Sequence, residues 1–164
     1  MKLSELKGRP VVSLADAQNV GNVGEVLVDR SYLQIQALTV LSKRRDAGLV
    51  VSFGAVRGIG PDAITIEDQK SLRAPSQVPE YDTFVRLGDL LHKNVLSEDG
   101  QVLGSISEIH FDAHSGRIDR FEYNGKPLAG LLGHVPDSVD ATDLVGVGPR
   151  SVTVRKREKP TRAA

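Results

Sequence analysis

The sequence contains no cysteine and no tryptophan, and only seven of its 164 residues are aromatic. Without cysteine the chain has no disulfide scaffold, no thiolate ligand for zinc or iron–sulfur centres, and no cysteine nucleophile. No stretch approaches the roughly 18 uninterrupted apolar residues of a membrane helix, and the N-terminus lacks the apolar region of a signal peptide. We therefore expect a soluble, cytoplasmic protein.

A net charge is absent as well, because 21 Lys and Arg balance 21 Asp and Glu. The hydrophobic content of 40% is too high for intrinsic disorder of the whole chain. The length suits one ordinary domain or two small ones of about 70 to 80 residues.

Three segments of the first half recur in the second half, which indicates an internal duplication. Glycine, proline and threonine stay in register in these segments while isoleucine and valine interchange, which two unrelated β-rich segments would rarely do. The recurring pairs are 11–13 with 95–97, 18–29 with 101–112, and 58–66 with 146–154. We expect a first domain over 1–75, a proline-containing linker over 76–83, a second domain over 84–154 and a basic, disordered tail over 155–164.

Both halves are rich in Val and Ile at a spacing of two, which predicts strands. In the first long strand Val26 and Val28 share a face opposite Leu27, and in the second half Ile109 and Phe111 lie opposite His110. We expect the first face of each pair to be core and the other to be mostly solvent.

The next strand of each half contains a break in this alternation. Ile35 is followed by Leu38, and Ile118 is followed by Phe121, a spacing of three that places them on opposite faces. A β-bulge near residues 36–37 and another near 119–120 would return these side chains to the core and help a short sheet to curl.

Short strands joined by glycine and proline turns predict an all-β fold of two small, pseudo-symmetric barrels in tandem. A unit of this size buries only about 60% of its unfolded surface. We therefore expect the two halves to pack on each other or the chain to self-associate as a homo-oligomer.

Each half resembles the PRC-barrel domain, whose pattern runs from a glycine-containing turn into an apolar strand ending in Asp, and on to a closing glycine turn and strand. The first half matches over 20–29 and 53–66, and the second over 103–112 and 144–154, with extra length near 125–133. The resemblance implies a six-stranded barrel that binds other macromolecules. Related barrels occur in the cytoplasmic part of the photosynthetic reaction centre H subunit, in ribosome maturation factors of the RimM type and in stand-alone prokaryotic proteins.

The motifs of this resemblance are turns and apolar positions. The two Gly-x-Gly segments are each followed by a proline, which lacks an N–H, and then by a strand, so they do not form a phosphate cradle. The residues assigned to structural turns are Gly21, Gly58, Gly60, Pro61, Gly104, Gly146, Gly148 and Pro149.

Candidate chemistry is confined to one hairpin. His110, Asp112 and His114 alternate along a strand and its turn, so they could supply nitrogen and oxygen ligands to a metal. A surface hairpin in which Asp112 bonds the backbone before Gly116 is the favoured interpretation. We expect no catalytic residues, no cofactor and no enzyme activity.

Basic residues cluster at two places, although the total charge is zero. Residues 76–154 hold 6 basic and 12 acidic side chains, whereas 155–164 hold 5 and 1. The clusters that could contact an anionic partner are Lys43, Arg44 and Arg45, and Arg155, Lys156 and Arg157.

The leading hypothesis is a non-enzymatic adaptor that presents a strand edge, or the seam between its barrels, to a protein partner. An accessory factor of ribosome maturation or RNA metabolism is the first alternative, with the basic clusters contacting phosphates. A peripheral factor at a membrane or photosynthetic complex is a further alternative.

Overall fold

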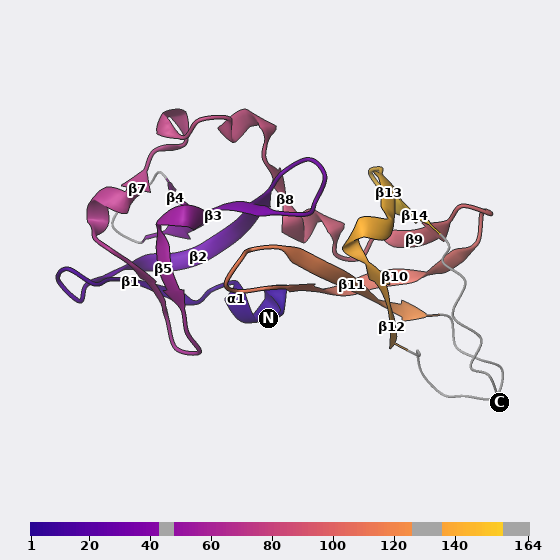
Figure 1. Cartoon of the computed structure of the whole chain (residues 1–164), viewed down its shortest axis with the longest axis horizontal. Coiled ribbons are helices and arrows are strands. Elements are labelled where there is room, and N and C mark those ends of the chain that lie inside the picture. Colours follow the sequence, from indigo (N-terminus) through magenta and orange to yellow (C-terminus); the bar gives the residue numbers. More distant parts are fainter. Residues whose placement is uncertain (43–47, 126–135, 156–164) are drawn as a thin grey trace.

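The computed structural model describes residues 1–42, 48–125 and 136–155 of the chain. Strands and short 3-10 helices make up nearly all of its regular structure, and the α-helix α1 (Leu3–Leu6) has four residues. None of the helices in the described part combines the length and the apolar character needed to cross a membrane. The two halves lie end to end along the longest axis of the molecule (Figure 1).

The first half is built around one curled sheet with the strand order β5-β6-β1-β2-β3-β4-β7. Strands β1 and β6 pair in parallel, and the other neighbours are antiparallel. The elements are β1 (Pro10–Ser13), β2 (Asn19–Val28), β3 (Ile35–Leu41), β4 (Leu49–Ser52), η1 (Phe53–Ala55), β5 (Val56–Ile59), β6 (Ile64–Ile66), η2 (Gln69–Ser71), β7 (Leu72–Arg73), η3 (Pro75–Gln77), η4 (Tyr81–Thr83) and β8 (Val85–Arg86).

The second half repeats this connectivity in a sheet with the order β12-β11-β10-β9-β14-β13, in which β9 and β14 pair in parallel. The fold is therefore all-β with two barrel-like units in tandem, as the sequence predicted. Its elements are η5 (Leu87–Leu90), β9 (Asn94–Ser97), β10 (Val102–Phe111), β11 (Ile118–Gly125), β12 (Pro136–Asp140), η6 (Ala141–Asp143), β13 (Leu144–Val147) and β14 (Ser151–Val154).

The two bulges expected from the break in alternation are present. Leu27 pairs with Ala37 while Val28 pairs with Ile35, so Gln36 is the extra residue. Its counterpart Asp119 is left over between two pairs of β10 and β11. The bulges turn the apolar side chains on either side of them into the core, because Ile35, Leu38, Val40, Ile118, Phe121 and Tyr123 are all buried.

Each half also pairs a short segment with the sheet of the other half. β8, which precedes the second sheet in sequence, pairs with β2 of the first, with Leu27 opposite Arg86 and Val28 opposite Val85. Reciprocally, Lys2 bridges to His110 in β10 of the second sheet. Each half thus completes the other's sheet, and a single hydrophobic core runs through both halves. The halves pack on each other, as their small size led us to expect.

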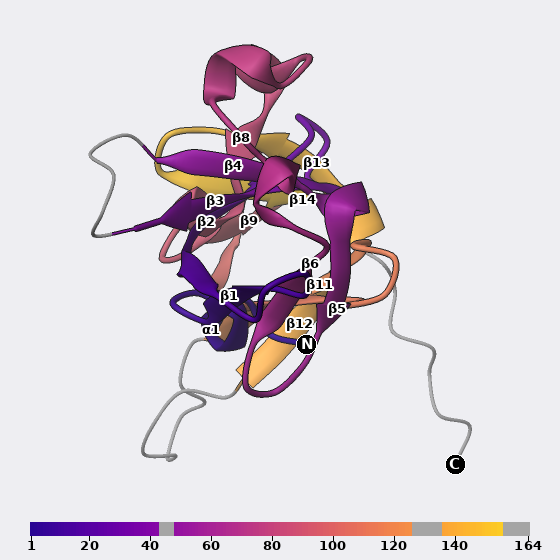
Figure 2. The same ribbon diagram turned by 90° about the vertical axis from the view of Figure 1, so that its left-hand side faces the viewer.

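The expectation that the second face of the long strands is mostly solvent is wrong at Leu27 and His110. Leu27 is 4% exposed and His110 is 9% exposed. In the first half, the segment between β7 and β8 arches over the sheet (Figures 1 and 2) and covers this face. It forms a second small core of Leu27, Ala37, Val50 and Val78, against which Tyr81 and Phe84 pack. Residues 76–83, expected as a linker, therefore include part of this cover.

Candidate functional site at the seam between the halves

The halves meet where the tips of two equivalent hairpins lie side by side. Gln34, at the tip between β2 and β3, bridges to Arg117, at the tip between β10 and β11. The amide of Ile35 donates to the carbonyl of Gly116, and the amide of Ile118 donates to the carbonyl of Leu33, both at 2.8 Å. Because Leu33 and Ile35 occupy the positions of Gly116 and Ile118 in the repeat, the seam has a pseudo-two-fold axis.

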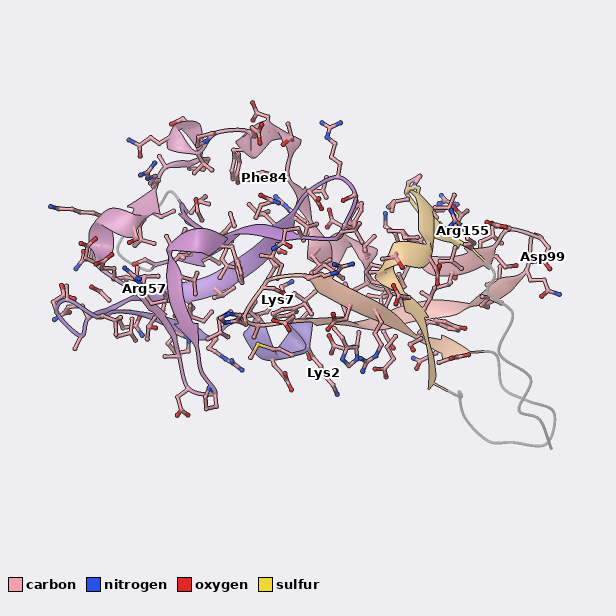
Figure 3. All side chains as sticks on the ribbon, in the orientation of Figure 1. Lys2, Lys7, Arg57, Phe84, Asp99 and Arg155 are labelled. Atoms are coloured by element: carbon pink, nitrogen blue, oxygen red, sulfur yellow. The ribbon has the colours of Figure 1, made fainter. Side chains whose placement is uncertain are left out.

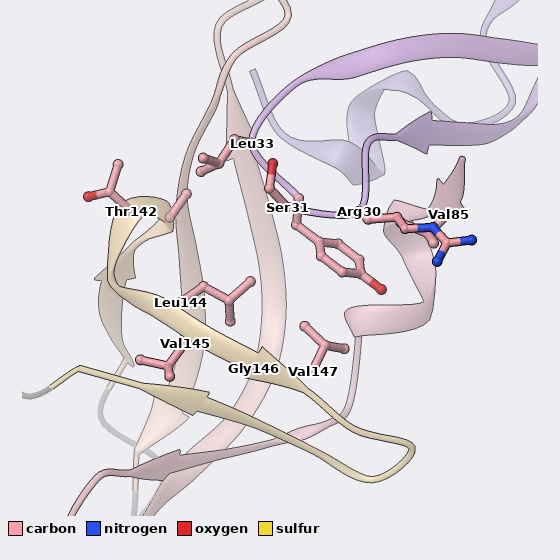
Figure 4. A pocket seen from close by; sticks show the side chains of 11 residues that line it. Arg30, Ser31, Leu33, Val85, Thr142, Leu144, Val145, Gly146 and Val147 are labelled. Atoms are coloured by element: carbon pink, nitrogen blue, oxygen red, sulfur yellow. The ribbon is translucent and has the colours of Figure 1, made fainter. Parts of the chain in front are cut away.

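Two grooves flank the seam, and each is made by the hairpin tip of one half and a 3-10 helix and edge strand of the other. The first groove has a volume of about 460 Å³ and the second about 510 Å³. Residues of the first groove are Arg30, Ser31, Tyr32, Leu33, Val85, Ala141, Thr142, Leu144, Val145, Gly146 and Val147 (Figure 4). Residues of the second groove are Phe53, Gly54, Val56, Arg57, Gly58, Ile59, Ala113, His114 and Ser115.

The linings of the two grooves have diverged by an exchange of large and small side chains. At the second groove the ring of Phe53 lies so close to Gly116 that a Cβ there would be 2.7 Å from Phe53 Cε1. At the first groove the equivalent positions hold Leu33 and Ala141, so the large side chain comes from the hairpin tip instead. The first groove is the more apolar of the two, and Arg30 is the one charged residue in its lining.

Tyr32 has a left-handed backbone conformation in the first groove, with φ of 59°. This conformation is strained for a bulky side chain, and the equivalent hairpin tip places a glycine, Gly116, at positive φ. Burial, together with the negative charge of Asp89, raises the pKa of the Tyr32 phenol above its ordinary value. The phenol is therefore neutral at physiological pH and can donate a hydrogen bond.

The glycine turns that close each half have a structural role. In the hairpin between β5 and β6, the amide of Gly60 donates to Ala63 and its carbonyl accepts a 2.6 Å hydrogen bond from Arg9 Nη1. Gly148 repeats both contacts, with Ser151 and with Lys93 Nζ. Pro61 and Pro149 follow in these hairpins, while Gly58 and Gly146 lie in β5 and β13 beside bulges.

Gly21 and Gly104 differ from the expected turns because they lie inside β2 and β10. A Cβ at Gly104 would overlap the carbonyl oxygen of Asn124, and one at Gly21 would overlap that of Leu41. Only glycine allows the backbones of neighbouring strands to approach so closely.

A scan of protein-family models matches the PRC-barrel domain to residues 82–156. The second half is a PRC-barrel domain. The match does not extend over 1–81, so the relation of the first half to this PRC-barrel domain rests on their shared strand order and bulges. No curated protein matches the chain.

The candidate metal ligands lie on the outer face and hairpin tip of the PRC-barrel domain. The side chains of Asp112 and His110 are engaged in other contacts, and His114 lines the second groove. Asp112 Oδ1 accepts from the amides of Ser115 and His114, and these hydrogen bonds lower the pKa of its carboxyl. His110 Nε2 lies 2.8 Å from Glu122 Oε2 instead. Among the residues that the structure describes, no group of three or more potential ligands could hold a metal ion.

The basic clusters fall largely outside the described residues. Lys43, Arg44 and Arg45 lie in 43–47, and Lys156 and Arg157 lie in 156–164. Arg155, at the end of the described PRC-barrel domain, is exposed, and its Nε is 4.0 Å from Glu98 Oε1 (Figure 3).

Sequence reasoning missed several residues of the first groove, notably Tyr32, Leu33, Val85 and Val145. They come from a hairpin tip, a two-residue strand and an edge strand, and none of these carries a motif. The one available signal was the comparison of the repeats, which sets Tyr32 against Ser115 and Val145 against Arg57.

Proposed function

We propose that this chain is a non-enzymatic adaptor of the cytoplasm that binds a protein partner at the seam of its two barrel-like halves. The observation that carries the proposal is the pair of equivalent grooves with diverged linings. A seam used only to hold the halves together would need no apolar groove at its margin, whereas interaction sites combine concave apolar surface with few polar groups.

The membership of the second half in the PRC-barrel family supports this proposal, because PRC-barrel domains are small β-barrel modules that often take part in protein interactions. The polar side chains singled out in the sequence also support it. Asp112 caps its hairpin, and His110 is tied to a neighbouring strand. These contacts are typical of a structural role.

The proposal is tested by crosslinked affinity purification of the full chain from an extract of the source cells, with and without nuclease. A parallel sample uses the chain truncated after Val154. We expect a protein that stays bound after nuclease treatment and without the tail. Partners lost with nuclease or with the tail would contradict the proposal and favour a role in RNA or ribosome metabolism.

A further inference from the structure

β5 and β13 are equivalent edge strands of the two sheets. They differ in whether a charged side chain protects the edge against pairing with another chain. Each pairs with one neighbour, β6 or β14, and with no other strand in the described residues. On β5, the exposed Arg57 forms a 2.9 Å ion pair with Glu67 across the edge hairpin (Figure 3). Charged side chains of this kind protect an edge strand against pairing with another chain.

On β13 the position of Arg57 is taken by Val145, a residue that is 57% exposed. An exposed β-branched residue on an unprotected edge favours the addition of another strand. The duplication makes this contrast informative, because the same position in the same fold carries a protecting charge in one half and an apolar side chain in the other.

The first groove runs along the open side of β13. Leu144 of β13 lies across it from Leu33, and Arg30 lies at its margin beside Val85 (Figure 4). Tyr32 and Val147 belong to the same lining. Arg30 is exposed and donates a long hydrogen bond of 3.4 Å from Nε to the carbonyl of Thr83. An unprotected edge, an apolar groove, a strained tyrosine and a cation therefore occur together at one place.

We propose that β13 and the first groove bind an extended, largely apolar peptide segment of a partner protein that carries a carboxylate side chain. This inference rests on the proposed function and names the site and the chemistry of its partner. The peptide adds to the sheet as a strand beside β13, so its backbone supplies hydrogen bonds. Alternate side chains enter the groove between Leu33 and Leu144, and the carboxylate pairs with Arg30.

A second copy of this chain fits the site less well than an acidic peptide. If two β13 strands paired antiparallel about a two-fold axis, the first grooves of both copies would lie at the interface. Arg30 is the one charged residue in each lining, so each copy would contribute a cation and neither would contribute a carboxylate. Charge complementarity therefore favours a segment that provides the missing carboxylate.

The test uses a displayed library of random linear peptides, selected on the full chain and counter-selected on Val145→Arg. This variant copies the protecting residue of β5 at an exposed position, so it is expected to fold. We expect enriched peptides to alternate apolar residues with an Asp or Glu, and to bind Val145→Arg at least about tenfold more weakly than wild type. Arg30→Glu should weaken the same peptides, and the matched charge reversal Arg73→Glu, at an exposed position of β7 outside both grooves, should not.

Several outcomes would overturn the inference. The first is that no peptides are enriched on the wild-type chain relative to Val145→Arg. The second is that the enriched peptides lack an acidic residue and bind Arg30→Glu as well as wild type. The third is that the chain self-associates and that Val145→Arg abolishes this self-association. Cell-extract partners that bind Val145→Arg as well as wild type would leave the adaptor proposal standing and move the site elsewhere. A wild-type chain that retains no protein partner would contradict the adaptor proposal itself.

Discussion

Gln34 and Arg117 form a single antiparallel bridge across the seam, at the same position of two hairpins that lie 83 residues apart. Gln34 strengthens the contact by donating from Nε2 to the carbonyl of Ser115 at 2.7 Å. The bridge lies on the pseudo-two-fold axis. At this point the hairpin tip of one copy of the repeat packs against the hairpin tip of the other copy.

Gly116→Ala should destabilise the protein by about 1 to 3 kcal/mol. The new Cβ would meet the Phe53 ring, and Gly116 has a φ of 74°. Urea unfolding measures the change. Gly100→Ala is the control, because Gly100 has a φ of 84° with nothing within 4 Å of the added Cβ. In the presence of Phe53→Ala, Gly116→Ala should cost less free energy of unfolding than it does alone. If the effects of the two substitutions simply add, the contact with Phe53 is not the cause of the loss.

Gly104→Ala should be the most damaging glycine substitution in the second half, at about 3 kcal/mol or more. The added Cβ would overlap the backbone of Asn124, which cannot rotate away as a side chain can. Gly146→Ala is the comparison, because its Cβ would lie 3.0 Å from Thr153 Oγ1, an atom of a side chain. Thermal unfolding of both variants ranks them, and equal melting temperatures would refute the close-approach argument.

Phe84→Ala should lower the free energy of unfolding by about 2 kcal/mol. Phe84 covers the outer face of the first sheet and contacts Tyr81 edge to face, with ring centroids 6.2 Å apart. Tyr81→Phe keeps the ring pair and should be nearly neutral. Hydrogen exchange that stays unchanged at Leu27 and Ala37 in Phe84→Ala would mean that the segment does not protect this face.

Tyr123 should be the last tyrosine to ionise as the pH rises. Burial, with the negative charge and the hydrogen bond of Asp137, raises the pKa of Tyr123 to about 12 from an ordinary value of 10.0. Because the folded state favours the neutral phenol, this stabilisation is complete below pH 10 and is lost as the pH rises toward 12. Absorbance titration of the phenolates should lose its highest step in Tyr123→Phe, and retention of that step would assign it to another tyrosine.

In its neutral form, His110 should carry its ring proton on Nε2. Arg120 Nη2 lies 3.3 Å from His110 Nδ1, and a guanidinium can only donate, so Nδ1 must accept. Nε2 then donates to Glu122 Oε2. Ring ¹⁵N chemical shifts distinguish the tautomers. A neutral ring with its proton on Nδ1 would rule out the hydrogen bond from Arg120.

The repeat made much of the fold predictable from the sequence. The break in alternation between Ile35 and Leu38, and again between Ile118 and Phe121, located both bulges, because buried positions must face the core whatever the local register. The exchanged strand β8 escaped prediction, since two residues carry no periodicity and its partner lies in the other half. The cover over Leu27 was missed as well, because its two short 3-10 helices carry no periodicity that shows where they pack.

The candidate site was predictable only in general terms. A binding site at a strand edge or at the seam could be expected from the resemblance. The sequence alone does not single out Tyr32 or Val145 as part of that site. Their role depends on the hairpin tip of one half meeting the edge strand of the other. Such contacts between distant segments follow from tertiary packing, which local patterns do not encode.

The reciprocal pairing of each half with the sheet of the other also affects how the stability depends on concentration. Two separate copies of such a unit would assemble by mass action, and dilution would weaken them. Joining them in one polypeptide replaces that equilibrium with a fixed, high effective concentration of each half near the other. The melting temperature should therefore stay constant across a wide range of protein concentrations, so the pairing of the halves persists even when few copies of the chain are present.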